Sequence, residues 1–96
     1  GEEQVKLPKE GHNIQIAHLV NDMHDGELFA KMSAELNYIF PIIDGKIQDY
    51  QNDSMGIFTI NVDDEHLKLV TDYLTKKGLN WHEIEEQHDE TKEDEE

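Results

Sequence analysis

The order of hydrophobic periodicities along the chain is the feature that most constrains its fold. Four segments have an extended, apolar character, and two carry apolar residues at helical spacing. In chain order these six segments cover residues 14–20, 25–36, 38–44, 56–62, 63–77 and 79–84. Alternation with a period of two indicates a strand, and recurrence at i, i+3 and i+4 indicates a helix. The chain is therefore predicted to run strand, helix, strand, strand, helix, strand.

Both predicted helices carry suitable residues at their ends. Asp25 is placed to cap the first helix, and Asn37 can adopt the left-handed conformation that follows its last turn. Asp63 or Asp64 is placed to cap the second helix, and Gly78 is the residue expected to end it. Each helix is therefore predicted to start and stop at a defined place.

Pro41 lies inside the second predicted strand, at residues 38–44. Since proline has no N–H to donate to a neighbouring strand, we expect this strand at a sheet edge or at a bulge. Gly45 is expected to mark a bend, after which the strand can continue to Tyr50. Residues 51–54 are then predicted to form a hairpin turn.

The two helical crossovers predict an α+β, ferredoxin-like fold of order βαββαβ. In that fold a four-stranded antiparallel sheet carries both helices on one face. The first three predicted strands, however, carry apolar residues on both faces. In the first strand Ile14, Ile16 and Val20 oppose Ala17 and Leu19, and in the second Ile39 and Ile43 oppose Phe40 and Ile42. Because a sheet that is apolar on both sides needs a second cover, we expect a partner surface, most simply another copy of the chain.

The length of 96 residues allows one domain at most. We predict a linker at residues 1–12, the folded domain at 13–85 and an acidic, disordered tail at 86–96. Gly1 without a preceding Met suggests a piece of a longer protein. No apolar run approaches the roughly 20 residues that span a bilayer.

The net charge of −15 excludes several classes of partner. Only eight residues are basic, all of them lysine, so the chain has no arginine for bidentate contacts with phosphate or guanine. Nucleic acid and anionic membrane surfaces are therefore not expected as partners.

No catalytic or metal-binding motif is apparent in the sequence. Cysteine is absent, and Gly45-Lys46 is followed by Ile47, which breaks the pattern of a phosphate-binding loop. His18, Asp22, His24 and Asp25 lie close together in the sequence, but they lack the spacing of a helical metal site. We expect no catalytic residue, no bound metal and no enzymatic activity in this chain.

Residues 28–84 resemble the NIL domain, an ACT-like ferredoxin fold at the C-terminus of the ATP-binding subunits of methionine-import ABC transporters. The family pattern is an Asn-Ile-Leu motif, a glycine, a Phe-Gly or similar step after a hairpin, an acidic helix start and a Leu-x-x-x-Gly exit. The corresponding positions here are Pro41-Ile42-Ile43, Gly45, Met55-Gly56, Asp63 to Glu65 and Leu74 to Gly78. Pro41 stands where the family has asparagine, and residues 21–24 lack the family's usual glycine-containing turn.

The resemblance implies a regulatory domain of an ATP-hydrolysing subunit at the cytoplasmic face of the cell membrane, working beside a membrane permease subunit. ATP and magnesium would bind an ATPase region outside this chain, and the chain itself would hold no cofactor. Two copies would form a homodimer through the helix-free sheet face, and methionine or a related amino acid would bind there. The implied ligand contacts lie on the second strand and its bend: Pro41, Ile42, Ile43, Gly45, Lys46 and Ile47.

The chemistry of these residues fits such a ligand. The isoleucines suit a thioether side chain, Gly45 permits close approach of the backbone, and Lys46 can meet a carboxylate. Two alternatives remain at this point. One is a stand-alone ACT-like amino-acid sensor or a NIL module fused to a ferredoxin, and the other is a purely structural dimerisation module whose ligand site has decayed.

Overall fold

The computed structural model describes residues 6–19 and 25–85 of the chain, and these residues confirm the predicted order of elements. The strands and helices are β1 (His12–Leu19), α1 (Asp25–Leu36), β2 (Ile42–Tyr50), β3 (Asp53–Val62), α2 (Leu67–Lys76) and β4 (Asn80–Ile84). A short 3-10 helix, η1 (Asp64–His66), leads directly into α2. No helix among the described residues is long and apolar enough to cross a membrane.

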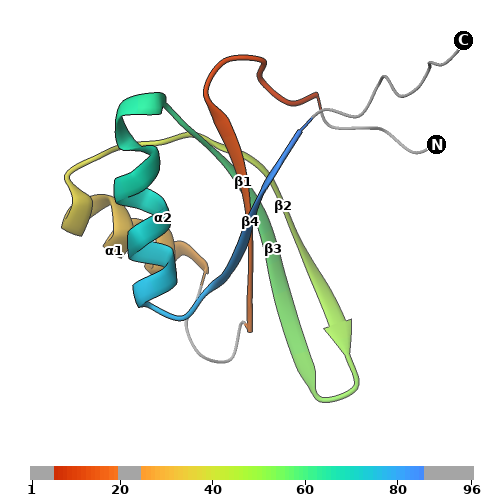
Figure 1. Cartoon of the computed structure of the whole chain (residues 1–96). Helices are drawn as coiled ribbons and strands as arrows, with labels where there is room; N and C mark the ends of the chain where they lie inside the picture. Colours follow the sequence, from red (N-terminus) through yellow and green to blue (C-terminus); the bar gives the residue numbers. More distant parts are fainter. Residues whose placement is uncertain (1–5, 20–24, 86–96) are drawn as a thin grey trace, which may run out of the picture.

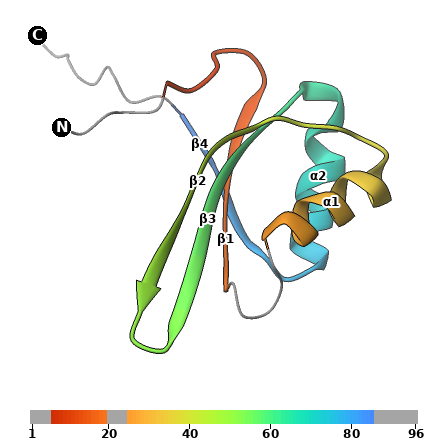
Figure 2. The same cartoon turned by 180° about the vertical axis from the view of Figure 1, so that it is seen from behind.

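The four strands form one antiparallel sheet in the order β2-β3-β1-β4. Both helices pack against the same face of this sheet, and no described helix lies on the opposite face (Figures 1 and 2). This arrangement is the predicted ferredoxin-like α+β fold. We call the two sides the helix-covered face and the helix-free face.

Strand β2 lies at an edge of the sheet, as the proline predicted, but its bounds differ from the expectation. It begins at Ile42 rather than at residue 38, and Pro41 precedes it. The carbonyl of Pro41 still accepts a hydrogen bond from the Asn61 N–H, at 3.1 Å. The ladder irregularity falls between Ile42 and Asp44 and not at Gly45, which pairs regularly with Phe58. The irregularity therefore lies beside Pro41, where an edge or bulge was expected, and the prediction of a bend at Gly45 was wrong.

The ends of the helices follow the predicted chemistry. Asn37 adopts a left-handed conformation with φ of 53° after α1, and Gly78 does the same with φ of 74° after α2. The Asp63 carboxylate accepts a hydrogen bond from the His66 N–H at 2.9 Å, so it caps η1 and not α2 itself. Asp25 is the first residue of α1, and its predicted capping contact involves side chains outside the described part of the chain.

The hydrophobic core fills the space between the helices and the helix-covered face. Its members are apolar residues that are almost entirely shielded from solvent: Ile14, Ile16, Leu28, Phe29, Met32, Phe40, Ile60, Val62, Val70 and Leu74. Phe29 of α1 meets Phe58 of β3 edge to face, with ring centroids 5.3 Å apart. Phe58 therefore points toward the helices. Because side chains alternate along a strand, the pairing register then assigns each remaining strand residue to one of the two faces.

The helix-free face is partly apolar. Ala17 lies opposite Ile57 and Leu19 opposite Met55, and we call these four residues the apolar patch. Val20 lies outside the described residues. The prediction for the second strand was wrong, because Ile39 and Phe40 lie before β2: Ile39 is 88% exposed, whereas Phe40 is buried in the core. Apolar residues therefore lie on both faces of β1 and β3, while β2 contributes less than expected.

The far end of the helix-free face is polar and already covered. The Asn61 amide donates to the Asn13 side-chain oxygen at 2.9 Å and to the Glu10 carbonyl at 3.0 Å, and the Asn13 amide donates to the Pro8 carbonyl at 3.1 Å. The segment that precedes β1 thus packs over this end of the sheet. Within residues 6–19 and 25–85, no segment covers the apolar patch near the β2–β3 hairpin in this way.

Candidate functional site

The predicted ligand-binding residues lie at the edge of the sheet. Pro41 is exposed just before β2, and Ile42, at the start of the strand, is 50% exposed. Ile43 lies inside the register shift between Ile42 and Asp44 and is half-buried. These three residues therefore surround the irregular start of β2, and their identity as ligand contacts stays a prediction.

The next three residues alternate between the two faces. Gly45 is paired with Phe58, so it faces the helices, and a Cβ added at this position would lie 2.5 Å from the Phe58 ring. The space beside the Gly45 backbone is thus occupied by the Phe58 ring of the domain itself and not by a ligand. Lys46 is paired with Ile57 and lies exposed on the helix-free face, whereas Ile47 is paired with Gly56 and is 49% exposed. The six residues do not converge on one cavity.

Lys46 is the predicted residue that the structure places beside the apolar patch. Its partner Ile57 belongs to the patch, and the neighbouring Gln48 is paired with Met55 of the same patch. A cation and an amide therefore flank an exposed apolar surface on the helix-free face. This combination can accept either an apolar molecule that carries a carboxylate or the same surface of a second chain.

His12 joins three elements at the opposite edge of the sheet. Its Nδ1 lies 2.7 Å from a Glu83 oxygen on β4, and its Nε2 lies 2.6 Å from an Asp64 oxygen in η1. The hydrogen bond to Glu83, followed by that to Asp64, raises the pKa of His12 above its ordinary value. The protonated ring is thus favoured in the folded state, where it bridges two carboxylates.

A second polar cluster holds the start of η1. The His66 ring stacks on the Tyr38 ring, with centroids 3.8 Å apart, and its Nδ1 lies 2.7 Å from the Asp63 carboxylate. The hydrogen bond to the His66 side chain holds the pKa of Asp63 below its usual value. The Tyr38 hydroxyl accepts a hydrogen bond from the Asp63 N–H at 3.0 Å. Both clusters connect structural elements and present no nucleophile.

The histidine and aspartate group near residues 18–25 forms no metal centre in the described part of the chain. His18 is buried and stacks on Phe58, with ring centroids 6.1 Å apart. Asp22 and His24 lie outside the described residues, as does the side chain of Asp25. What the structure shows of this group is therefore the packing of His18.

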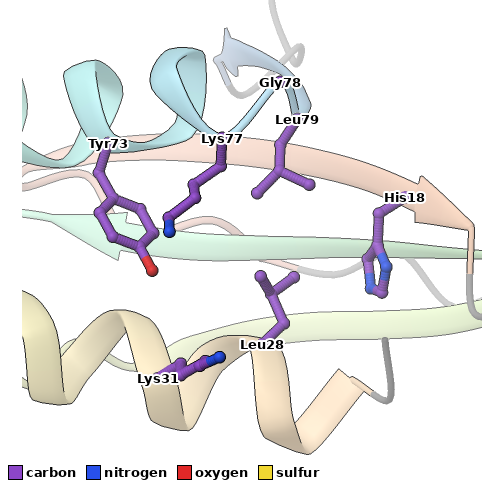
Figure 3. A pocket seen from close by; sticks show the side chains of 7 residues that line it. All are labelled: His18, Leu28, Lys31, Tyr73, Lys77, Gly78 and Leu79. Carbon is purple, nitrogen blue, oxygen red and sulfur yellow. The ribbon is translucent and has the colours of Figure 1, made fainter. Parts of the chain in front are cut away.

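A hollow between the two helices was not anticipated from the sequence. It has a volume of about 240 Å³, and Figure 3 shows the residues that line it: His18, Leu28, Lys31, Tyr73, Lys77, Gly78 and Leu79. No motif connects these residues, because they come from β1, α1, α2 and the turn before β4. Only the packing of the helices on the sheet brings them together.

Comparisons with known proteins agree with this fold. A model of the NIL domain family matches residues 16–83. Methionine import ATP-binding protein MetN of Clostridioides difficile is 38% identical over 84 residues, which make up 88% of this chain and 26% of that protein. The protein of the same name from Clostridium acetobutylicum is 35% identical over 75 residues, or 78% of this chain and 23% of that protein.

The chain spans about a quarter of the length of these curated relatives. No solved structure gives a significant match. The match to the family model begins within β1, ends within β4 and includes both helices. The chain therefore belongs to the NIL domain family.

Proposed function

We propose that this chain is the regulatory domain of the ATP-binding subunit of a methionine-import ABC transporter. The observation that carries the proposal is the 38% identity, over 84 residues, to a protein named as a methionine import ATP-binding protein. The ATPase activity belongs to a part of the parent protein outside this chain. In that setting the domain works at the cytoplasmic face of the membrane, beside a permease subunit, and modulates transport without catalysing a reaction.

The second part of the proposal is that two copies pair through the helix-free face. The apolar patch of Ala17, Leu19, Met55 and Ile57 supports it, because a partly exposed apolar surface of this kind is stabilised when a second surface covers it. The fully buried Ile14 and Ile16 face the helices, so the contact between copies does not involve them.

The third part is that methionine, or a related amino acid, binds along β2 on the dimer-facing side. Lys46 supports this, because its ammonium group can meet the ligand carboxylate while the apolar patch receives the thioether. Of the other predicted contacts, Pro41, Ile42 and Ile43 would contribute at the start of β2, whereas Gly45 and Ile47 face the helices and would contribute only backbone atoms. Pro41 supplies neither the amide side chain nor the N–H that the family's asparagine would supply, so we expect weak binding.

Calorimetric titration with L-methionine tests this function. The wild type and Pro41→Asn are compared, and Pro41→Ala serves as the matched control because it restores the N–H without the amide side chain. A recovered hydrogen bond contributes about 0.5–1.5 kcal/mol, so Pro41→Asn should bind roughly three- to tenfold more tightly than the wild type. Tight binding by the wild type with no gain in Pro41→Asn would contradict the placement of the site.

A structural module with a decayed ligand site is the second candidate. Two observations favour it: Pro41 replaces the asparagine, and the Phe58 ring already occupies the space next to Gly45. If neither the wild type nor Pro41→Asn releases heat with methionine while the chain still dimerises, this second function replaces the first. The third possibility, a stand-alone amino-acid sensor, differs in the parent protein, and the sequence adjoining Gly1 in that protein distinguishes it.

A further inference from the structure

The hollow between α1 and α2 has an unusual charge for this protein. The chain has a net charge of −15 and only eight lysines, yet two of those lysines, Lys31 and Lys77, line one hollow together with His18. None of the seven lining residues is acidic. Two cationic side chains therefore gather in one concave site of a strongly negative molecule.

The two lysines differ in how far their charge is balanced. Lys77 Nζ lies 4.0 Å from a Glu35 oxygen, at the outer limit of an ion pair, and 5.4 Å from the centroid of the Tyr73 ring. Lys31, on α1, has no carboxylate within ion-pair distance among the residues that the structure describes. Among the described residues, Lys31 is thus the lysine of the hollow that has no carboxylate partner.

The Tyr73 hydroxyl does not add a negative charge to this site. Burial, and secondly a hydrogen bond to Glu35, raise the pKa of Tyr73 to about 12. The hydroxyl therefore stays protonated at neutral pH and donates its hydrogen bond to the Glu35 carboxylate. Glu35 does not line the hollow, but its carboxylate, 4.0 Å from Lys77 Nζ, partly balances the charge of that lysine.

The rest of the wall is apolar. Leu28 is almost fully buried, and Figure 3 shows the Leu28 and Leu79 side chains pointing toward each other across the hollow, with the Tyr73 ring at one end. Since one water occupies roughly 30 Å³ of liquid, a volume of about 240 Å³ matches an organic molecule of roughly eight non-hydrogen atoms. The hollow thus combines a short apolar slot with a cationic rim.

We infer that this hollow is a binding site for a small aliphatic carboxylate, with the carboxylate held at Lys31 and Lys77 and the hydrocarbon between Leu28 and Leu79. The site is distinct from the one proposed along β2. It shares no residue with that site, and its one strand residue, His18, lies on β1, which β3 separates from the β2 edge. It lies within one chain, so its occupancy does not depend on pairing.

The test is a titration of the ¹⁵N-labelled chain with sodium hexanoate at constant ionic strength, followed by amide chemical shifts. We expect saturable shifts at Leu28, Lys31, Gly78 and Leu79, with half-saturation on the order of 1 mM for a ligand of this size. Hexan-1-ol, which has the tail without the charge, and inorganic phosphate, which has the charge without the tail, should each bind at least about tenfold more weakly.

Three variants assign the effect to this hollow. Lys31→Gln and Lys77→Gln should each weaken hexanoate binding by about three- to tenfold, because each removes a charge-assisted contact. Lys76→Gln makes the same charge change one residue away, outside the lining, and should weaken binding less than about twofold. Absence of saturable shifts, equal losses in Lys76→Gln and Lys31→Gln, or equal affinity for hexan-1-ol or phosphate would each overturn the inference.

Discussion

The two faces of the sheet carry apolar residues from the same strands but use them differently. On the helix-covered face Ile14, Ile16, Ile60 and Val62 are completely shielded from solvent by the helices. On the helix-free face the apolar patch occupies one end of β1 and β3, beside a polar end, and stays partly exposed. An apolar strand residue in this sequence therefore belongs to the core only where a helix packs over it. On the other face it marks a surface available to a partner.

The largest predicted change in stability distinguishes two isoleucines of β3 that lie on opposite faces of the sheet. Ile60→Ala removes a fully buried side chain on the helix-covered face and should lower the free energy of unfolding by about 2–5 kcal/mol, enough to unfold much of a small domain. Ile57→Ala, three residues earlier and half-buried on the helix-free face, should cost about 1 kcal/mol at low protein concentration. Urea unfolding measures both.

The same two variants, Ile60→Ala and Ile57→Ala, should also differ in how their stability depends on protein concentration. If a second copy covers the apolar patch, the destabilisation by Ile57→Ala should grow as the chain is concentrated, because the native dimer then gains stability by mass action. The destabilisation by Ile60→Ala should show no corresponding growth. Equal unfolding free energies for the two variants would show that the faces do not differ as described.

A smaller effect is expected at the edge strand, where neighbouring residues lie on opposite faces. Gly45→Ala places a Cβ 2.5 Å from the Phe58 ring, so the ring must move, and the cost should be about 1–3 kcal/mol. Lys46→Ala, one residue along on the helix-free face, should change stability by less than about 0.5 kcal/mol. Thermal unfolding checks both, and a neutral Gly45→Ala would show that the ring is free to move aside.

The smallest effect should come from His12, which ties the start of β1 to β4 and η1. Its pKa is raised in the folded state, so its contribution to stability is present below about pH 6.5 and is lost as the pH rises through the folded-state value. Exposed ion pairs contribute about 0.2–1 kcal/mol each, so the loss should be of that order. The free energy of unfolding, measured at about pH 6 and pH 9, checks the sign.

The control for this pH dependence is another histidine substitution. His12→Gln should flatten the fall in stability between the two pH values, whereas His82→Gln, at an exposed position of β4, should leave it intact. A fall of equal size in the wild type and in His12→Gln would mean that general self-repulsion of the −15 charge, and not the bridge to Glu83 and Asp64, governs the pH dependence.

Much of the fold could be predicted because it rests on local chemistry. The alternation of Ile14 and Ile16 with Ala17 and Leu19 determines the faces of β1, and Gly78 marks the end of the second helix. The start of β2 could not be predicted in the same way. Its register depends on how β2 pairs with β3, and a shift between Ile42 and Asp44 decides which face each later residue occupies.

The candidate sites were less accessible to sequence reasoning. A ligand site along β2 was expected on one face, but the register turns Gly45 toward Phe58 and Lys46 away from it. Lys31 and Lys77 give no signal in the sequence, since Lys31 lies on α1 and Lys77 follows α2, and they meet only because both helices pack on one face of the sheet. Tertiary packing and not periodicity creates such a site.

The measurement that tests the central claim most directly is sedimentation equilibrium of the 11.2 kDa chain at micromolar concentration, comparing the wild type with Ile57→Asp. We predict that the wild type sediments with twice the mass of one chain. Ile57→Asp should sediment as a folded monomer, because an unpaired carboxylate in the apolar patch opposes its burial. A wild type that stays monomeric, or an Ile57→Asp variant that stays dimeric, would contradict the account of the helix-free face as the surface that binds a second copy.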